Sequence, residues 1–274
     1  MQEKLKSLIF NTGLQMEFKS NCKHEWETIG NHLVCSKCNK SKLKLEQINK
    51  DLMQGTRDDG KSYSVRIDKN RYFYPDEWIK FYDNLNSKNK LLFEFLICTG
   101  ARIEEALTFN KDGLIDDKRK SIKLYVTKRK AKKEGEQFGK PRSFEISTSL
   151  YNKLRASKNH FMFIDVIENI NLNTQEGRLS LKKYTKPKST LAYIVLRNNL
   201  KAVGIKDYYN FGLHSIRKTH GMWLKTMNID MGEICNRLGH DTNTYLKHYG
   251  SPSLFQLKDK QLMIKVLGDI YGFK

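Results

Sequence analysis

Apolar residues recur at helical spacing over most of the chain from residue 72 onward, and this pattern constrains the fold more than any other feature. Tyr74-Pro75 is followed by two acidic residues, a combination typical of the first turn of a helix. A second helix is predicted over residues 91–98, and a third opens at Ala101. The rest of the pattern predicts a polar loop at 170–188 and helices near residues 148–156, 189–203, 214–227, 231–238 and 253–267.

In two short segments the apolar residues follow a different periodicity. Residues 121–127 and 142–147 alternate apolar and polar side chains, as in a strand with one buried face. The stretch between them is polar and contains glycine, so we predict a β-hairpin with a basic tip. The basic residues of the tip are Lys128, Arg129, Lys130, Lys132 and Lys133. The predicted fold class is therefore mainly α with a small β-sheet or hairpin, an α+β fold.

The charge balance indicates a polyanionic partner. The chain has 274 residues, with 50 Lys and Arg against 30 Asp and Glu, a formal net charge of +20. Nucleic acid is the commonest partner of such a chain, and a lysine-rich proteome with solvated lysines is the alternative. Hydrophobic residues make up 39 %, which is enough for a folded core. No run approaches the ~20 apolar residues of a membrane span, and we expect neither a membrane partner nor a secretory signal.

Five cysteines, three of them close together near the N-terminus, fit a reducing, cytosolic setting better than a disulfide framework. Cys22-x-His24 followed by Cys35-x-x-Cys38 supplies four ligands, the set that a closed tetrahedral zinc site requires. His32 is an alternative ligand, and buried thiols without a metal are the alternative interpretation. Because all four positions are filled, we expect a structural zinc ion and no catalytic one.

These patterns divide the chain into two parts. Residues 1–71 form an N-terminal region, with a zinc-ribbon-like module at about 20–40 and a charged connector over 41–71. Residues 72–274 form the domain with the helices and the hairpin. Its last segment, 251–274, is an apolar helix that must dock on some surface.

The domain also contains the residue types that DNA strand cleavage requires. A phosphodiester is shielded by negative charge, and its leaving sugar oxygen needs a proton. Cations on the nonbridging oxygens, a general acid and a covalent tyrosine nucleophile meet these needs without a catalytic metal. Two arginines that could supply these cations occur in the segments TGARIEEAL and LHSIR. The candidate catalytic residues are Arg102, Lys128, His214, Arg217, His240 and Tyr249.

Together these segments resemble the tyrosine recombinase (phage integrase) family. TGARIEEAL resembles that family's first arginine box, with Glu105 where the family usually has an acid, and LHSIR matches its His-x-x-Arg box. The 23 residues from Arg217 to His240, and the nine from His240 to Tyr249, are spacings that the family shows. The resemblance covers about residues 72–274 and implies the catalytic fold of that family.

The resemblance implies a role for each candidate. Arg102 and Arg217 would clamp the scissile phosphate, a task that suits bidentate guanidinium groups. His214 and His240 would bind the phosphate or help to move the tyrosine proton. Beyond the structural zinc, no cofactor is expected, and none is required for catalysis.

The nucleophile and the general acid each have competitors nearby in the sequence. By the resemblance, Tyr249 would become linked to the 3′ phosphate and Lys128 would protonate the leaving 5′ oxygen. Tyr245 lies one helical turn before Tyr249, and Lys130 and Lys132 share the hairpin tip with Lys128. Spacing favours Tyr249, and the position directly after the strand favours Lys128.

The implied function is that of a site-specific DNA recombinase or integrase, which cuts and rejoins double-stranded DNA through a 3′-phosphotyrosyl intermediate. In that family the segment after the tyrosine packs on a neighbouring protomer, which implies a tetramer on DNA. Docking of residues 251–274 on their own domain is the alternative. A cytoplasmic protein is expected, associated with the nucleoid or encoded by a virus or mobile element. The 71 N-terminal residues leave little room for the helical DNA-clamping domain that family members usually carry.

Two other functions compete with this one. The first is DNA relaxation by a type IB topoisomerase-like enzyme, which uses the same chemistry. That family typically has lysine where His214 stands. The second is a non-catalytic, zinc-containing DNA-binding protein, which is disfavoured because Arg102, Arg217 and Tyr249 are all present.

Overall fold

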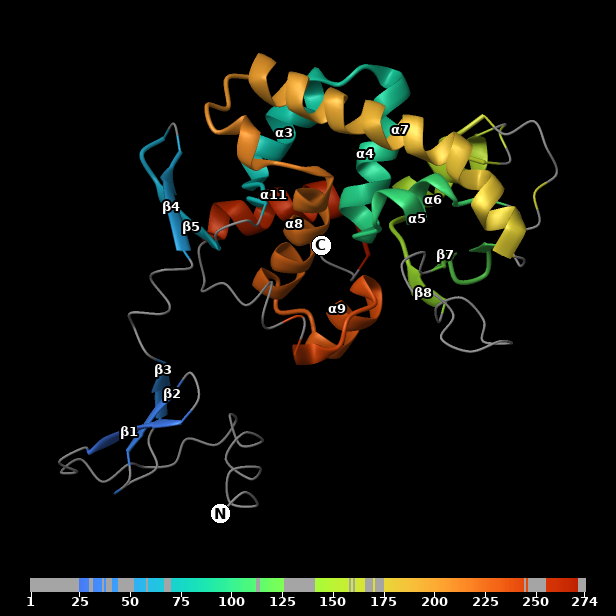
Figure 1. The fold of residues 1–274 in the computed structure, drawn as a ribbon. Helices are drawn as coiled ribbons and strands as arrows, with labels where there is room; N and C mark the ends of the chain where they lie inside the picture. Colours follow the sequence, from blue (N-terminus) through green and yellow to red (C-terminus); the bar gives the residue numbers. More distant parts are fainter. Residues whose placement is uncertain are drawn as a thin grey trace. The chain divides into compact units, whose positions relative to one another are not determined.

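The computed structural model describes residues 25–29, 32–35, 37, 41–43, 52–57, 59–66, 70–111, 114–125, 141–157, 159, 161–165, 170, 175–243, 245 and 255–270. The chain divides into two compact units, Met1–Gln54 and Gly55–Lys274. Figure 1 follows the helices and strands of these units along the chain. None of the helices within the described ranges is long and apolar enough to cross a membrane.

The first unit contains a three-stranded antiparallel sheet. Its strands lie in the order β1 (Trp26–Ile29), β2 (His32–Cys35) and β3 (Ser41–Leu43). The register places Trp26 opposite Cys35, and Cys35 is buried.

The zinc site predicted in this unit falls mostly outside the described residues. Of its four ligands, only Cys35 is described; Cys22, His24 and Cys38 are not. Within the described residues, no three His, Cys, Asp or Glu side chains form a group that could hold a metal ion. The zinc ion therefore stays a prediction.

The segment predicted to be a connector contains a hairpin. β4 (Leu52–Thr56) pairs with β5 (Ser62–Arg66) in a two-stranded sheet. The second compact unit begins at Gly55, within this hairpin, and the domain boundary at residue 72 stays a prediction. Arg57 and Arg71, two charged residues of this segment, form ion pairs with Glu77 of the helical domain.

Two buried arginines anchor the hairpin. Arg57 and Arg71 both approach Glu77 Oε1, with Arg57 Nε at 3.2 Å and Arg71 Nη2 at 2.6 Å. Arg71 Nη1 also lies 2.7 Å from Asp207 Oδ1, and the Tyr63 hydroxyl donates to the other oxygen of the same carboxylate. Since opposite charges are paired throughout, this cluster is buried without an isolated charge.

The helices of the second unit form at or close to their predicted positions. α4 begins earlier than predicted, at Ser87, because the Asn86 side chain accepts a hydrogen bond from the backbone N–H of Asn89 and caps the helix. α6 and α9 have the predicted bounds. The helices are α3 (Pro75–Asn84), α4 (Ser87–Thr99), α5 (Ile103–Leu107), α6 (Thr148–Ala156), α7 (Gln175–Ala202), α8 (Leu213–Thr226), α9 (Met231–Leu238) and α11 (Leu257–Leu267).

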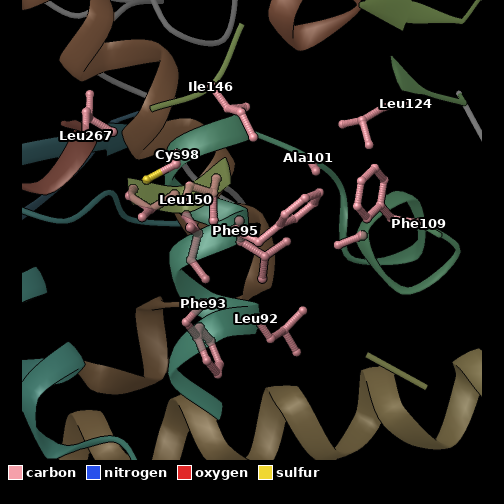
Figure 2. Packing of buried hydrophobic residues seen from close by; sticks show 14 of the residues in the cluster. Leu92, Phe93, Phe95, Cys98, Ala101, Phe109, Leu124, Ile146, Leu150 and Leu267 are labelled. Carbon is pink, nitrogen blue, oxygen red and sulfur yellow. The ribbon is translucent and has the colours of Figure 1, made fainter. Parts of the chain in front are cut away.

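α4 lies at the centre of the hydrophobic core and contacts α5, α6, α8 and α11. Phe95 and Cys98 of α4 are buried together with Leu150 of α6 and Leu267 of α11, as Figure 2 shows. Burial on several sides makes α4 a rigid support. The segment that follows it, beginning at Ala101, therefore starts from a fixed point.

The prediction of a loop at 170–188 was wrong for most of that range. α7 begins at Gln175 and runs through Pro187. Leu181 and Thr185 are buried one turn apart and start an apolar stripe that lies against the core. The stripe was hidden in the sequence because lysines and a proline fill the other faces of the helix. It continues with Ala192, Leu196 and Leu200.

The predicted hairpin is confirmed as part of a three-stranded antiparallel sheet. The strands are β6 (Ile115–Asp116), β7 (Ser121–Leu124) and β8 (Arg142–Glu145), in that order. Ile122 lies opposite Phe144, and both are buried. β6 was missed because two residues show no periodicity. Residues 126–140, which include the predicted basic tip, lie outside the described residues.

The C-terminal helix α11 packs against α3, α4 and α8 of its own chain. Met263 and Leu267 are buried in these contacts, and the Cys98 thiol lies 3.6 Å from the carbonyl oxygen of Val266. The single chain thus adopts the alternative arrangement, in which the tail covers its own domain. Of the segment 251–254 nothing is described.

Candidate active site

Arg102 is positioned by the end of α4 and the beginning of α5. Gly100 ends α4 with φ of 61°, and a Cβ at this position would lie 2.5 Å from His220, so only glycine fits here. The Arg102 backbone N–H donates to Glu105 Oε2 at 2.8 Å, and its Nη1 donates to Oε1 at 2.7 Å. The Arg102 side chain remains 19 % exposed, and it can therefore still reach a ligand.

Glu105 is the centre of a cluster of arginines. Its carboxylate is buried and accepts two hydrogen bonds from Arg142, at 3.2 Å to Oε1 and 2.5 Å to Oε2. Arg217 Nη1 lies 3.9 Å from Oε2. Burial raises the pKa of Glu105, but the hydrogen bonds and charge of Arg142, with the charges of Arg217 and Arg102, outweigh it and lower the pKa to about 2. Glu105 is therefore ionised at neutral pH.

Arg217 lies on α8 and joins three segments. Its Nη1 donates to the Gly100 carbonyl oxygen at 2.6 Å, and its Nη2 donates to the Leu238 carbonyl oxygen. The same Nη2 lies 3.1 Å from His240 Nε2. Gly239 ends α9 in the left-handed region, with φ of 58°, and so turns the chain toward Arg217. The structure thus brings together two of the candidate catalytic residues, Arg217 and His240.

Of the other predicted catalytic residues, only His214 is described. His214 is exposed in the first turn of α8. Lys128 and Tyr249 lie outside the described residues. Tyr245, the alternative nucleophile, is fully buried and its hydroxyl donates to the Gly221 carbonyl oxygen at 3.2 Å. In this arrangement Tyr245 is part of the hydrophobic core and is not accessible to DNA.

Arg142 was missed by the sequence analysis. It shares the buried face of β8 with Phe144, since the two residues alternate with exposed ones along the strand. Its position on the apolar face of a predicted strand was the signal in the sequence that this charged residue is buried. A buried arginine needs a carboxylate partner, and Glu105 provides it.

His220 was also missed. It is fully buried one turn after Arg217, and its Nδ1 lies 2.7 Å from the Ile97 carbonyl oxygen. Burial lowers the pKa of His220, and the charges of Arg237, Arg217 and Arg142 lower it further, to about 3. The imidazole is therefore neutral and donates to the carbonyl oxygen, which ties α8 to the end of α4.

These two groups predict a loss of stability in acid. Glu105 and His220 both have folded-state pKa values, about 2 and about 3, below their ordinary values of 4.5 and 6.5. The unfolded chain binds more protons in these ranges, so stability is full above them and falls as the pH falls. We expect the free energy of unfolding, measured with urea, to decrease from pH 7 to pH 4. The decrease should begin below about 6.5, where unfolded His220 takes up its proton.

The variant His220→Asn tests the contribution of the histidine. Asparagine retains a donor for the Ile97 carbonyl oxygen but does not titrate. We expect a flatter dependence on pH between 6.5 and 4.5 than in the unaltered protein. Equal slopes for the two proteins would contradict the prediction.

The sequence matches none of the curated proteins. Among solved structures, XerA recombinase is 16% identical with a TM-score of 0.46, covering 72% of this chain and 65% of that chain. XerH site-specific recombinase bound to palindromic difH substrate is 17% identical with a TM-score of 0.46, covering 76% and 59%. The catalytic domain of bacteriophage HP1 integrase is 18% identical with a TM-score of 0.42, covering 68% and 91%.

This chain thus spans less than two thirds of the XerA and XerH chains. The model of the phage integrase family matches residues 71–253, which hold both arginine boxes and the whole Glu105 cluster. That match covers more than half of the chain, and therefore the chain belongs to the phage integrase (tyrosine recombinase) family.

Proposed function

We propose that this protein cuts and rejoins double-stranded DNA at specific sites through a covalent bond between Tyr249 and the 3′ phosphate. The observation that carries the proposal is the buried Glu105 carboxylate, which aligns Arg102, Arg142 and Arg217 beside His240. Three guanidinium groups and one carboxylate leave a surplus of positive charge. Such a preorganised surplus stabilises the charge that builds on a phosphoryl group during transfer.

In the proposed reaction the Tyr249 oxygen attacks phosphorus and the bond from phosphorus to the 5′ oxygen breaks. The tyrosine proton leaves to a base, for which His240 is the candidate, and Lys128 gives a proton to the 5′ oxygen. Attack by a 5′ hydroxyl on the phosphotyrosine reverses these steps and rejoins the strand. The phosphotyrosine bond conserves the energy of the broken bond, and no high-energy cofactor is consumed.

Arg102 and Arg217 contribute differently in this proposal. Arg102 is partly exposed and uses one terminal nitrogen for Glu105, so the rest of its guanidinium group is available to the phosphate. Arg217 is buried and orients His240 and the main chain around it. His214, exposed at the beginning of α8, is proposed to contact the phosphate from that side.

Assembly is a further part of the proposal. A recombinase must hold two DNA sites together, and we propose a tetramer on DNA. For α11 to link protomers, Met263 and Leu267 would have to leave their contacts within the chain and find equivalent ones on a neighbour. Because the buried apolar area would be exchanged rather than lost, the exchange can be close to neutral in free energy.

The decisive experiment uses a nicked, labelled DNA from which the cut end diffuses away. After incubation with such DNA and denaturation, the full-length protein should carry covalently bound label. Failure to trap label with any cleavable DNA would contradict the proposal, and would favour a non-catalytic DNA-binding protein. Recombinant products from two sites, rather than relaxed circles alone, distinguish a recombinase from a topoisomerase.

We also propose a structural zinc ion held by Cys22, His24, Cys35 and Cys38. The antiparallel register of β1 and β2 supports it, because Cys35 ends β2 opposite Trp26 at the beginning of β1. In sequence, Cys22 and His24 precede β1 and Cys38 follows β2. Thiolate and imidazole ligands in a closed set suit zinc, which would stabilise a sheet with a very small core.

Metal analysis tests this site. We expect about one zinc ion per chain in the purified protein. The variant Cys35→Ser should lose the zinc, whereas Cys235→Ser, which alters a buried cysteine of α9, should retain it. Protein without zinc as purified in zinc-containing medium, or full zinc content in Cys35→Ser, would contradict the proposal.

A further inference from the structure

Arg142 connects the two parts of the proposed active site. It is the first residue of β8, and the register places it opposite Leu124, the last residue of β7. Residues 126–140, which carry Lys128, come between these two strands in sequence. The Arg142 side chain is 4 % exposed and reaches away from the strand to Glu105 on α5. The base of the hairpin is thereby fixed to the arginine cluster.

Arg142 also lies against the turn that carries His240. A Cβ on Gly239 would lie 3.3 Å from Arg142 Nη1, so the guanidinium group packs directly on this turn. Arg142 therefore contacts both the segment after α4, through Glu105, and the segment after α9. These are the segments that hold Arg102 and His240.

Hydrogen bonds from Arg142 also determine how strongly the Glu105 carboxylate binds Arg102. Both carboxylate oxygens of Glu105 accept from Arg142. Without these donors, a buried carboxylate would draw more strongly on Arg102, whose side chain is partly exposed. Glu105 would then compete with DNA phosphate for the same guanidinium group. A planar fork with two donors suits this task better than a lysine ammonium group does.

We infer that Arg142 is a positioning residue for strand cleavage: through Glu105 it leaves Arg102 free to bind the scissile phosphate and holds the base of the β7–β8 hairpin in register with the cluster. The inference rests on the proposed strand cleavage. It adds a residue that acts on the reaction through other residues and does not touch DNA.

The test compares two DNA substrates in single-turnover cleavage. One has a normal scissile phosphate; in the other a methyl group replaces one nonbridging oxygen and removes the negative charge that Arg102 would bind. For Arg142→Gln we expect cleavage of the normal substrate to fall about 100-fold, with DNA affinity within about threefold of the unaltered protein. On the methyl-substituted substrate the loss should be much smaller. Arg142→Lys should recover part of the rate and serves as the test protein if Arg142→Gln does not fold.

The ratio of the two rates identifies the role, because an inactive fraction of protein lowers both rates equally. Arg237→Gln is the matched control: Arg237 is a buried arginine of α9 that pairs with Glu233 at 2.9 Å and donates to the Glu145 carbonyl oxygen at 2.8 Å. It should lower stability and leave the ratio unchanged. An unchanged ratio in the Arg142 variants, or cleavage within about threefold of normal, would overturn the inference. Absence of cleavage by the unaltered protein would instead overturn the proposed function.

Discussion

Replacing Tyr249 by phenylalanine should abolish the covalent protein–DNA adduct and leave DNA binding unchanged. Only the hydroxyl group is lost, and with it the nucleophile, whereas the net charge that governs binding to DNA stays the same. The measurement is denaturing electrophoresis of protein incubated with labelled, nicked DNA. A parallel gel under native conditions reports binding by the same variant.

Tyr245→Phe is the matched control for this result. Tyr245 is buried and its hydroxyl donates to the Gly221 carbonyl oxygen, so its loss should reduce thermal stability and retain the adduct. The opposite pattern, an adduct in Tyr249→Phe and none in Tyr245→Phe, would show that the nucleophile is misassigned.

Replacing Arg102 by alanine should lower the cleavage rate by about 100-fold or more, a loss of roughly 3 kcal/mol in the transition state. Arg217→Ala should lose at least as much, with lower stability as well. The reason is that the carbonyl oxygens of Gly100 and Leu238 would both lose a donor inside the domain. Single-turnover rates, corrected for the fraction of active protein, separate these two effects.

Arg155→Ala provides the comparison for both. Arg155 pairs with Asp117 on the surface, with a side chain 33% exposed, and has no contact with the Glu105 cluster in the described structure. We expect normal cleavage from it, since a surface ion pair contributes little. Near-normal cleavage by Arg102→Ala or Arg217→Ala would remove the phosphate clamp from the proposed mechanism.

Local rules in the sequence predicted most of the fold. The alternation around Ile122 and Phe144 predicted the sheet, and apolar stripes predicted the helices of the core. The predictions for α7 and for the hairpin β4–β5 failed for one reason. The buried faces of these elements contain few apolar residues or consist of polar ones. α7 conceals a narrow stripe beginning at Leu181 among lysines, and the hairpin β4–β5 is held by ion pairs such as Arg57–Glu77. Neither arrangement produces a clear periodic pattern of apolar residues in the sequence.

The candidate site was predictable where spacing along the chain carries information. The interval from Arg217 to His240 is part of the family resemblance that singled out both residues, and the structure places Arg217 Nη2 3.1 Å from His240 Nε2. Arg142 was not predictable in the same way, because its contact with Glu105 depends on how β8 is placed beside α5. No rule of local spacing connects a strand residue to a helix on another part of the chain.

The anchored hairpin determines where the catalytic unit can be separated from the rest of the chain. The family match begins at residue 71, but the folded unit begins at Gly55. A protein shortened to residue 72 would lack Arg57 and Arg71 and would keep Glu77, which is buried at the beginning of α3 and whose pKa burial already raises. A buried carboxylate without its cations is costly, and so the first turn of α3 would lose its support. A catalytic fragment that is to fold by itself therefore has to retain the whole hairpin.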